Sequence, residues 1–226
     1  MSRSSQNQIQ VTVKRAVGAL LCALLCCAGT GAQAATLVVN VLKRDGKPLP
    51  GAVITAEPES ATASAAPAEK AIMDQVNLAF LPDVLVIPVH STVQFPNSDA
   101  VGHQVYSFSS ARQFQLPLYR GKPYPPVQFD QPGVVTLGCN IHDNMLGYII
   151  VTAAPFFGRT DTRGEWQGHD LPTGKFRVRV WHPLLNEPQD LERSVDLDGD
   201  PGSVEFRLVK PLRPAPLSGR PRSWDY

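Results

Sequence analysis

Three side chains with metal-binding chemistry follow one another at intervals of three residues: Cys139, His142 and Met145. A thiolate, an imidazole and a thioether form the soft ligand set that copper favours, whereas structural zinc sites do not use methionine. A copper site of the blue type also needs a second histidine, and His103 is the candidate because it follows a predicted strand end. The residue types therefore predict one copper ion bound by His103, Cys139, His142 and Met145.

The N-terminal segment has the features of a secretory signal peptide. Lys14 and Arg15 precede an apolar run over residues 16–28, and residues 32–34 supply the small side chains that signal peptidase recognises. A run of about 13 apolar residues is too short to span a bilayer, which takes about 20. We therefore expect cleavage after Ala34, export to the periplasm and no integral membrane segment in the mature chain.

Cys139 is then the one cysteine left, because Cys22, Cys26 and Cys27 belong to the signal peptide. A lone thiol in an oxidising compartment is buried and inert, joined to another chain, catalytic, or bound to a metal. A nucleophilic thiol paired with His142 would call for an orienting Asn or Asp, and it would not need a methionine nearby. The spacing favours metal binding over the structural and catalytic alternatives.

The elements that must position these ligands are predicted to be strands. Val135, Leu137 and Cys139 alternate with polar or small residues, so the segment 133–139 is expected to turn the sulfur toward a core. A further strand is expected over 147–152, which places the remaining ligands in a loop. Other short strand patterns are expected over 83–89, 92–95, 104–108 and 127–129. Short strands at this spacing indicate a β-sandwich.

The composition agrees with an all-β fold and excludes some functions. Twenty-one prolines and 17 glycines recur between β-branched runs, and 43% of the residues are hydrophobic, which is enough for a core. The formal net charge is +1 and no block of like charges occurs, so nucleic acid is not an expected partner.

The segment from about 70 to 155 resembles the cupredoxins. The resemblance lies in His103, in the spacing of Cys139, His142 and Met145, which is that of amicyanin and pseudoazurin, and in residues 95–99. The match is closer to bacterial periplasmic cupredoxin-like proteins catalogued as methylamine utilization proteins. The resemblance implies a type 1 copper site with Met145 as the weak axial ligand. It also implies a one-electron carrier that is not an enzyme and that meets a redox partner protein in the periplasm.

The flanking segments resemble a carboxypeptidase regulatory-like (transthyretin-like) β-sandwich. The resemblance lies in residues 45–52, 160–164 and 170–180. It implies that residues 35–60 and 156–210 form one sandwich, interrupted by a linker over 61–69 and by the cupredoxin-like segment over 70–155. Two consecutive domains, or one sandwich with long loops, are the alternatives. The proline-rich stretch over 211–226 is expected to be disordered.

Two other functions fit the same residues. A copper donor would release Cu(I) to a partner, and Ile141 and Asp143 stand where amicyanin-type loops carry proline, which would loosen the ligand loop. A non-redox module that binds carbohydrate or protein is the other alternative. A carrier instead needs ligands that are held firmly, and Asn97 is expected to support them. His90, His169, His182 and Met73 are expected to have solvated or packing roles.

Overall fold

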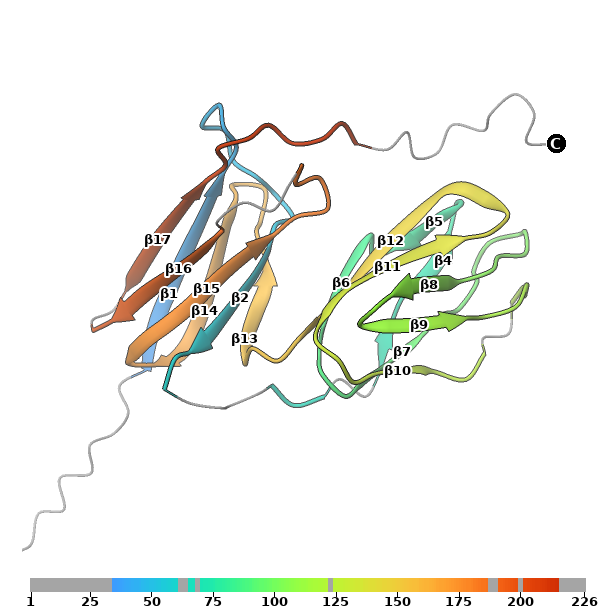
Figure 1. Cartoon of the computed structure of the whole chain (residues 1–226), viewed down its shortest axis with the longest axis horizontal. Coiled ribbons are helices and arrows are strands. Elements are labelled where there is room, and N and C mark those ends of the chain that lie inside the picture. The colour runs from blue at the N-terminus through green and yellow to red at the C-terminus, as the bar shows by residue number, and fades with distance from the viewer. Residues whose placement is uncertain are drawn as a thin grey trace, which may run out of the picture. The chain divides into compact units, whose positions relative to one another are not determined.

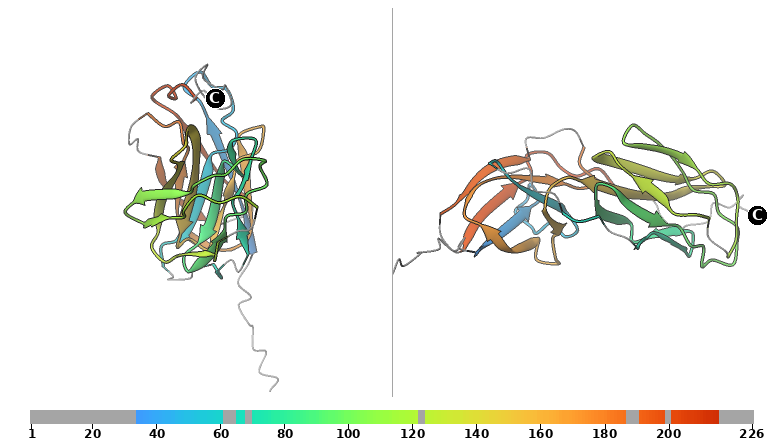
Figure 2. Two further views of the ribbon diagram at one scale, coloured as in Figure 1. Left: turned by 90° about the vertical axis from the view of Figure 1, so that its right-hand side faces the viewer. Right: turned by 90° about the horizontal axis from the view of Figure 1, so that it is seen from below.

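The computed structural model of the chain describes residues 34–60, 65–67, 70–121, 124–186, 191–198 and 201–215. Every helix or strand assigned within these ranges is a strand, as Figures 1 and 2 show from three directions, so the all-β prediction is confirmed. The described residues contain no helix that is long and apolar enough to cross a membrane. The predicted signal peptide over residues 1–34 lies outside the described ranges except for Ala34.

Two sheets form what we call the flanking sandwich. The first sheet has the order β14-β1-β17 and consists of β14 (Glu165–Pro172), β1 (Ala34–Leu42) and β17 (Gly202–Arg207). The second has the order β13-β2-β15-β16 and consists of β13 (Phe156–Arg159), β2 (Val53–Pro58), β15 (Gly174–Trp181) and β16 (Glu192–Leu197). Figure 1 shows β1 in blue between β17 and β14, so strands from both ends of the described chain share one sheet.

Period-two alternation builds the core between these two sheets. Alternate residues of β1 are buried, as are Phe176, Val178 and Val180 of β15, and all belong to one apolar cluster. Burial of a side chain as large as Phe176 stabilises the fold by about 1.5–3 kcal/mol. Such alternation is typical of strands with one face in a core.

Three further sheets form what we call the central sandwich. The largest has the order β6-β12-β11-β8-β9 and consists of β6 (Val84–Pro88), β12 (His142–Thr152), β11 (Gly133–Cys139), β8 (Tyr106–Ser109) and β9 (Arg112–Gln115). A smaller sheet has the order β10-β7-β3 and consists of β10 (Val127–Phe129), β7 (Ser91–Gln94) and β3 (Ala71–Ile72). A two-stranded hairpin adds β4 (Asp74–Val76) and β5 (Ala79–Leu81).

The core of the central sandwich holds the predicted inward face of β11. Val135, Leu137 and Cys139 are buried in one cluster with Phe95 and Phe129. The sulfur of Cys139 therefore faces the core, as the alternation of the sequence indicates.

The chain leaves and re-enters the flanking sandwich at neighbouring points. β2 is the last flanking strand before the central sandwich, and β13 is the first one after it. These two strands are antiparallel partners, with Ala56 opposite Phe156. In this register, the end of β2, where the chain leaves the flanking sandwich, lies beside the start of β13, where the chain returns to it.

Some expectations differ from the structure. β12 begins at His142, whereas a loop is expected there; after a register irregularity at Gly138, Cys139 still pairs with His142. His169 lies in β14, which pairs with β1, and its side chain is exposed. The β4–β5 hairpin and the strands β9, β13 and β16 give no clear sequence signal, because they are short or mostly polar.

Residues 211–215, which begin the C-terminal segment expected to be disordered, make contacts in the structure, and the expectation for the whole segment stays a prediction. Leu212 packs against the flanking core, the Arg213 amide donates a 2.8 Å hydrogen bond to the carbonyl of Leu184, and its guanidinium donates one to Pro183. Residues 216–226 lie outside the described ranges, as does most of the predicted linker over 61–69.

It stays a prediction that the central segment interrupts one flanking sandwich that folds by itself. The position of β13 beside β2 leads to a test of this prediction. Replacement of residues 60–154 by a linker of about four residues should leave a folded flanking sandwich, since Ala56 and Phe156 are antiparallel neighbours that a short connection can join. Thermal unfolding followed by circular dichroism should show one cooperative transition. A shortened chain with no such transition would contradict the layout.

Candidate metal centre

The β11–β12 hairpin places a thiol and an imidazole side by side. Cys139 ends β11 and His142 begins β12, and the two residues pair across a turn made of Asn140 and Ile141. A register irregularity follows Gly138 at this point. The Cys139 Sγ atom lies 3.6 Å from His142 Nδ1.

The third donor comes from the segment that connects β7 to β8. His103 exchanges two backbone hydrogen bonds of 3.0 Å with Tyr119, which anchors this segment outside the regular sheets. The His103 Nδ1 atom lies 3.1 Å from His142 Nδ1 and 3.8 Å from Cys139 Sγ. Residues far apart in the sequence thus direct three donor atoms to one point.

The three donor atoms fit a single metal ion. A point equidistant from the three atoms lies about 2.0 Å from each, which is the length of a bond from a first-row metal to an imidazole nitrogen. Within the described ranges, no other group of three or more His, Cys, Asp or Glu side chains has this proximity. The donor set of two imidazoles and one thiolate suits copper, zinc or another borderline ion.

The fourth predicted ligand, Met145, lies nearby in the same strand as His142. Its side chain is 2% exposed and belongs to the same apolar cluster as Cys139. The structure therefore places the Met145 side chain in the core that also contains Cys139. Its assignment as an axial ligand stays a prediction.

The donors differ in their access to solvent. His103 is 0% exposed and Cys139 is 3% exposed, whereas His142 is only half-buried. His142 is therefore the side chain through which this group reaches the surface.

Hydrogen bonds to other residues fix the two buried metal-binding side chains, Cys139 and His103. The backbone amide of Gln104 donates to Cys139 Sγ over 3.5 Å. The Nε2 atom of His103 lies 2.7 Å from Asp99 Oδ2. This second contact is absent from the sequence predictions.

The pKa of Asp99 is lowered by its partners. Partial burial of the carboxyl group would raise the pKa, but hydrogen bonds from the Leu78 amide, from His103 and from the Asn77 amide outweigh it. The carboxylate is therefore the form that faces His103 at neutral pH.

Asn97 supports the loop that carries His103, as expected. Its Nδ2 atom donates 3.0 Å hydrogen bonds to the carbonyls of Val101 and Tyr119, and its Oδ1 atom accepts one from the Asp99 amide. Behind it, the Tyr119 hydroxyl donates to the Phe95 carbonyl. Burial raises the pKa of Tyr119 to about 12, so the phenol stays protonated.

The remaining histidines lie outside the donor group. His90 is exposed and lies 3.0 Å from Asp130, and His169 is exposed on β14. Burial, together with nearby Arg159, lowers the pKa of His182 to about 4. Met73 is fully buried in the central core.

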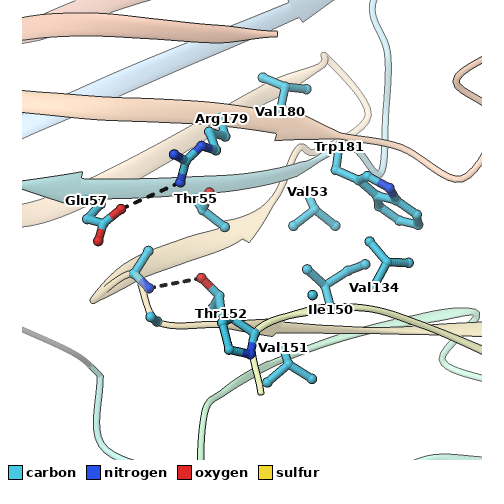
Figure 3. A pocket seen from close by; sticks show the side chains of 14 residues that line it. Val53, Thr55, Glu57, Val134, Ile150, Val151, Thr152, Arg179, Val180 and Trp181 are labelled. Carbon is cyan, nitrogen blue, oxygen red and sulfur yellow. Dashed lines mark hydrogen bonds and ion pairs between the residues drawn. The ribbon is translucent and has the colours of Figure 1, made fainter. Parts of the chain in front are cut away.

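A separate pocket offers no comparable chemistry. Figure 3 shows it, with a volume of about 500 Å³ and a mostly aliphatic lining that includes Val53, Ile150 and Val180. Its two charged lining residues, Arg179 and Glu57, form an ion pair at 3.6 Å. None of the predicted ligand residues lines this pocket.

Comparison with known proteins gives similar solved structures only. No family model and no curated protein matches the chain. A copper-containing nitrite reductase from Thermus scotoductus SA-01 is 29% identical with a TM-score of 0.36, over 42% of this chain and 25% of the reductase. The match therefore spans about a quarter of the reductase.

Two smaller proteins are also similar. A purple cupredoxin from Nitrosopumilus maritimus is 25% identical with a TM-score of 0.33, over 37% of this chain and 99% of that protein. A reduced amicyanin mutant is 21% identical with a TM-score of 0.34, over 43% of this chain and 99% of amicyanin.

The geometry predicts one metal ion per chain at this group. Cys139→Ser and His103→Ala should each weaken Cu(II) binding by about tenfold or more, because each variant removes one of three donors. His90→Ala, which changes an exposed histidine outside the group, is the matched control and should bind like the unchanged protein. Equilibrium dialysis with Cu(II) would measure this, and equal binding by all four proteins would disprove the assignment.

Proposed function

We propose that this chain is an exported, cupredoxin-like protein that carries single electrons through one type 1 copper site. The observation that supports this most is the triangle of two histidine Nδ1 atoms and one cysteine Sγ atom, with sides of 3.1, 3.6 and 3.8 Å. Two imidazoles and a thiolate in one plane are the ligands of blue-copper electron-transfer sites.

Each ligand has a distinct part in this proposal. Copper, when bound, supplies the one-electron couple between Cu(II) and Cu(I). Cys139, His103 and His142 hold the ion, and Met145 is the weak fourth ligand that tunes its potential. Four protein ligands leave no open position for a substrate, so we expect no catalysis.

Firmly held ligands favour a carrier over a copper donor. Cys139 and His142 belong to hydrogen-bonded strands, and the turn between them has only two residues. His103 is anchored by two backbone hydrogen bonds to Tyr119. A carrier needs ligands that move little when the charge of the ion changes, whereas a donor needs a loose ligand loop.

The surface at the half-buried ligand suits a protein partner. Ile141, beside His142 in the turn, is 51% exposed, and Leu118, which packs over Gly102, is 60% exposed. Exposed aliphatic side chains around a ligand that reaches the surface allow close approach of a second protein without the removal of charges from water. We propose that the redox partner docks at this end of the central sandwich.

The proposed location is the periplasm. It rests on the signal-like segment over residues 1–34 and on Cys139, the one cysteine that would remain after cleavage.

Copper retention and the reduction potential test the carrier proposal. Cu(I) should stay bound through repeated reduction and reoxidation in the presence of a moderate-affinity Cu(I) chelator. Met145→Leu should raise the reduction potential with copper still bound, because loss of the thioether destabilises Cu(II) more than Cu(I). Cyclic voltammetry on the mature protein would measure both properties.

Met73→Leu is the matched control for this variant, since Met73 is a buried methionine of the same core. It should leave the potential unchanged. Transfer of Cu(I) from the unchanged protein to the chelator would support the donor function instead. A shift in Met73→Leu in place of Met145→Leu would overturn the axial assignment.

A further inference from the structure

The carboxylate of Asp99 accepts three hydrogen bonds from two separate parts of the chain. Its Oδ1 atom accepts from the amide of Asn77 at 2.6 Å, and its Oδ2 atom accepts from the amide of Leu78 at 2.9 Å. The same Oδ2 atom lies 2.7 Å from His103 Nε2. The side chain is only 11% exposed, so water competes little for these bonds.

The two amides belong to the turn of the β4–β5 hairpin, and the backbone of this turn is unusual. Asn77 and Leu78 have φ values of 53° and 59°, in the left-handed region that residues with side chains rarely adopt. In this conformation, two successive backbone N–H groups are directed at the Asp99 carboxylate. Successive N–H groups of this kind form a binding place for an anion.

The hairpin itself is seated firmly on the large sheet. Phe80 of β5 is 2% exposed and covers Gly147 of β12, where an added Cβ atom would lie 2.8 Å from the Phe80 side chain. The turn amides are therefore fixed relative to β12, the strand that begins with His142. Through Asp99, the same hairpin reaches the other histidine of the donor group.

The chemistry of a carboxylate determines which nitrogen of His103 bears hydrogen. An ionised carboxylate only accepts hydrogen bonds, so the Nε2 atom of His103 must be the donor. In the neutral ring, Nδ1 then has a free lone pair. That lone pair points to the place where His142 Nδ1 and Cys139 Sγ converge.

We propose that Asp99, held by the β4–β5 turn, is a positioning residue that sets the ring orientation and the tautomer of His103 for metal binding. Asp99 does not contact the metal; it acts through His103. The inference rests on the proposed metal site, but its effect on the tautomer is present without any metal.

Asp74 provides a matched control in the same region. Its carboxylate also joins the hairpin to the loop before His103, because it accepts hydrogen bonds from the Ser98 hydroxyl at 2.7 Å and the Ser98 amide at 3.2 Å. None of its hydrogen bonds involves a histidine. Asp74→Ala therefore loosens the same loop without loss of the contact to His103.

The first measurement uses the full mature protein without metal. Nitrogen-15 NMR of the histidine rings should show hydrogen on Nε2 of His103 in the unchanged protein and in Asp74→Ala. In Asp99→Ala the ring should populate both tautomers. Hydrogen on Nδ1 of His103 in the unchanged protein would overturn the proposal, even if Asp99→Ala fails to fold.

The second measurement is Cu(I) affinity by competition with a chromogenic chelator. Asp99→Ala should weaken binding by about 10–100-fold, the usual effect when the partner of a ligating histidine is removed. Asp74→Ala should bind within about threefold of the unchanged protein. Equal losses in the two variants would overturn the proposal, because they would show that loop stability alone is involved.

The two measurements separate this inference from the proposed function. If the unchanged protein binds copper but does not cycle between its oxidation states, the electron-carrier proposal fails while the affinity comparison still tests Asp99. If the tautomer is insensitive to Asp99→Ala, the positioning role fails while the carrier proposal stands.

Discussion

The convergence of two imidazole nitrogens and one sulfur within 4 Å is the constraint on which the central sandwich depends. Two of these three side chains, His103 and Cys139, are buried, and polar groups that are buried without partners are unfavourable. The chain meets this constraint with a hydrogen bond to each of the two buried side chains: the Gln104 amide bonds Cys139, and Asp99 bonds His103. The lone pairs that remain face one another, which is the arrangement that a metal ion stabilises.

Rigid elements supply this arrangement from two directions. The β11–β12 hairpin carries Cys139 and His142 on paired strands, so their separation follows from strand geometry and a two-residue turn. His103 comes from an irregular segment and needs more support, which Tyr119, Asn97 and Asp99 provide. The residue of the group with the least regular backbone is thus held by backbone bonds to Tyr119, by a side-chain bond to Asp99 and, indirectly, by Asn97.

The flanking sandwich serves the site only indirectly. Its strands come from both sides of the central segment, and β2 and β13 meet where the chain passes from one sandwich to the other. Arg159 of β13 also bonds the Asp83 carboxylate and the Val84 carbonyl at the start of β6. Contacts of this kind hold the start of β6 in the central sandwich. The group of His103, Cys139 and His142 depends instead on hydrogen bonds within the central sandwich itself.

Sequence alone determined the properties that arise from local periodicity and residue chemistry: the all-β class, the inward face of β11 that ends in Cys139, and the choice of His103, Cys139 and His142 as candidate metal-binding side chains, which the structure brings together. It did not indicate Asp99 or the β4–β5 hairpin. Asp99 resembles any loop aspartate, and its role depends on turn amides from residues 77 and 78. Only the tertiary structure brings those amides to it, because the packing of Phe80 on β12, and not any local pattern, sets the distance between them.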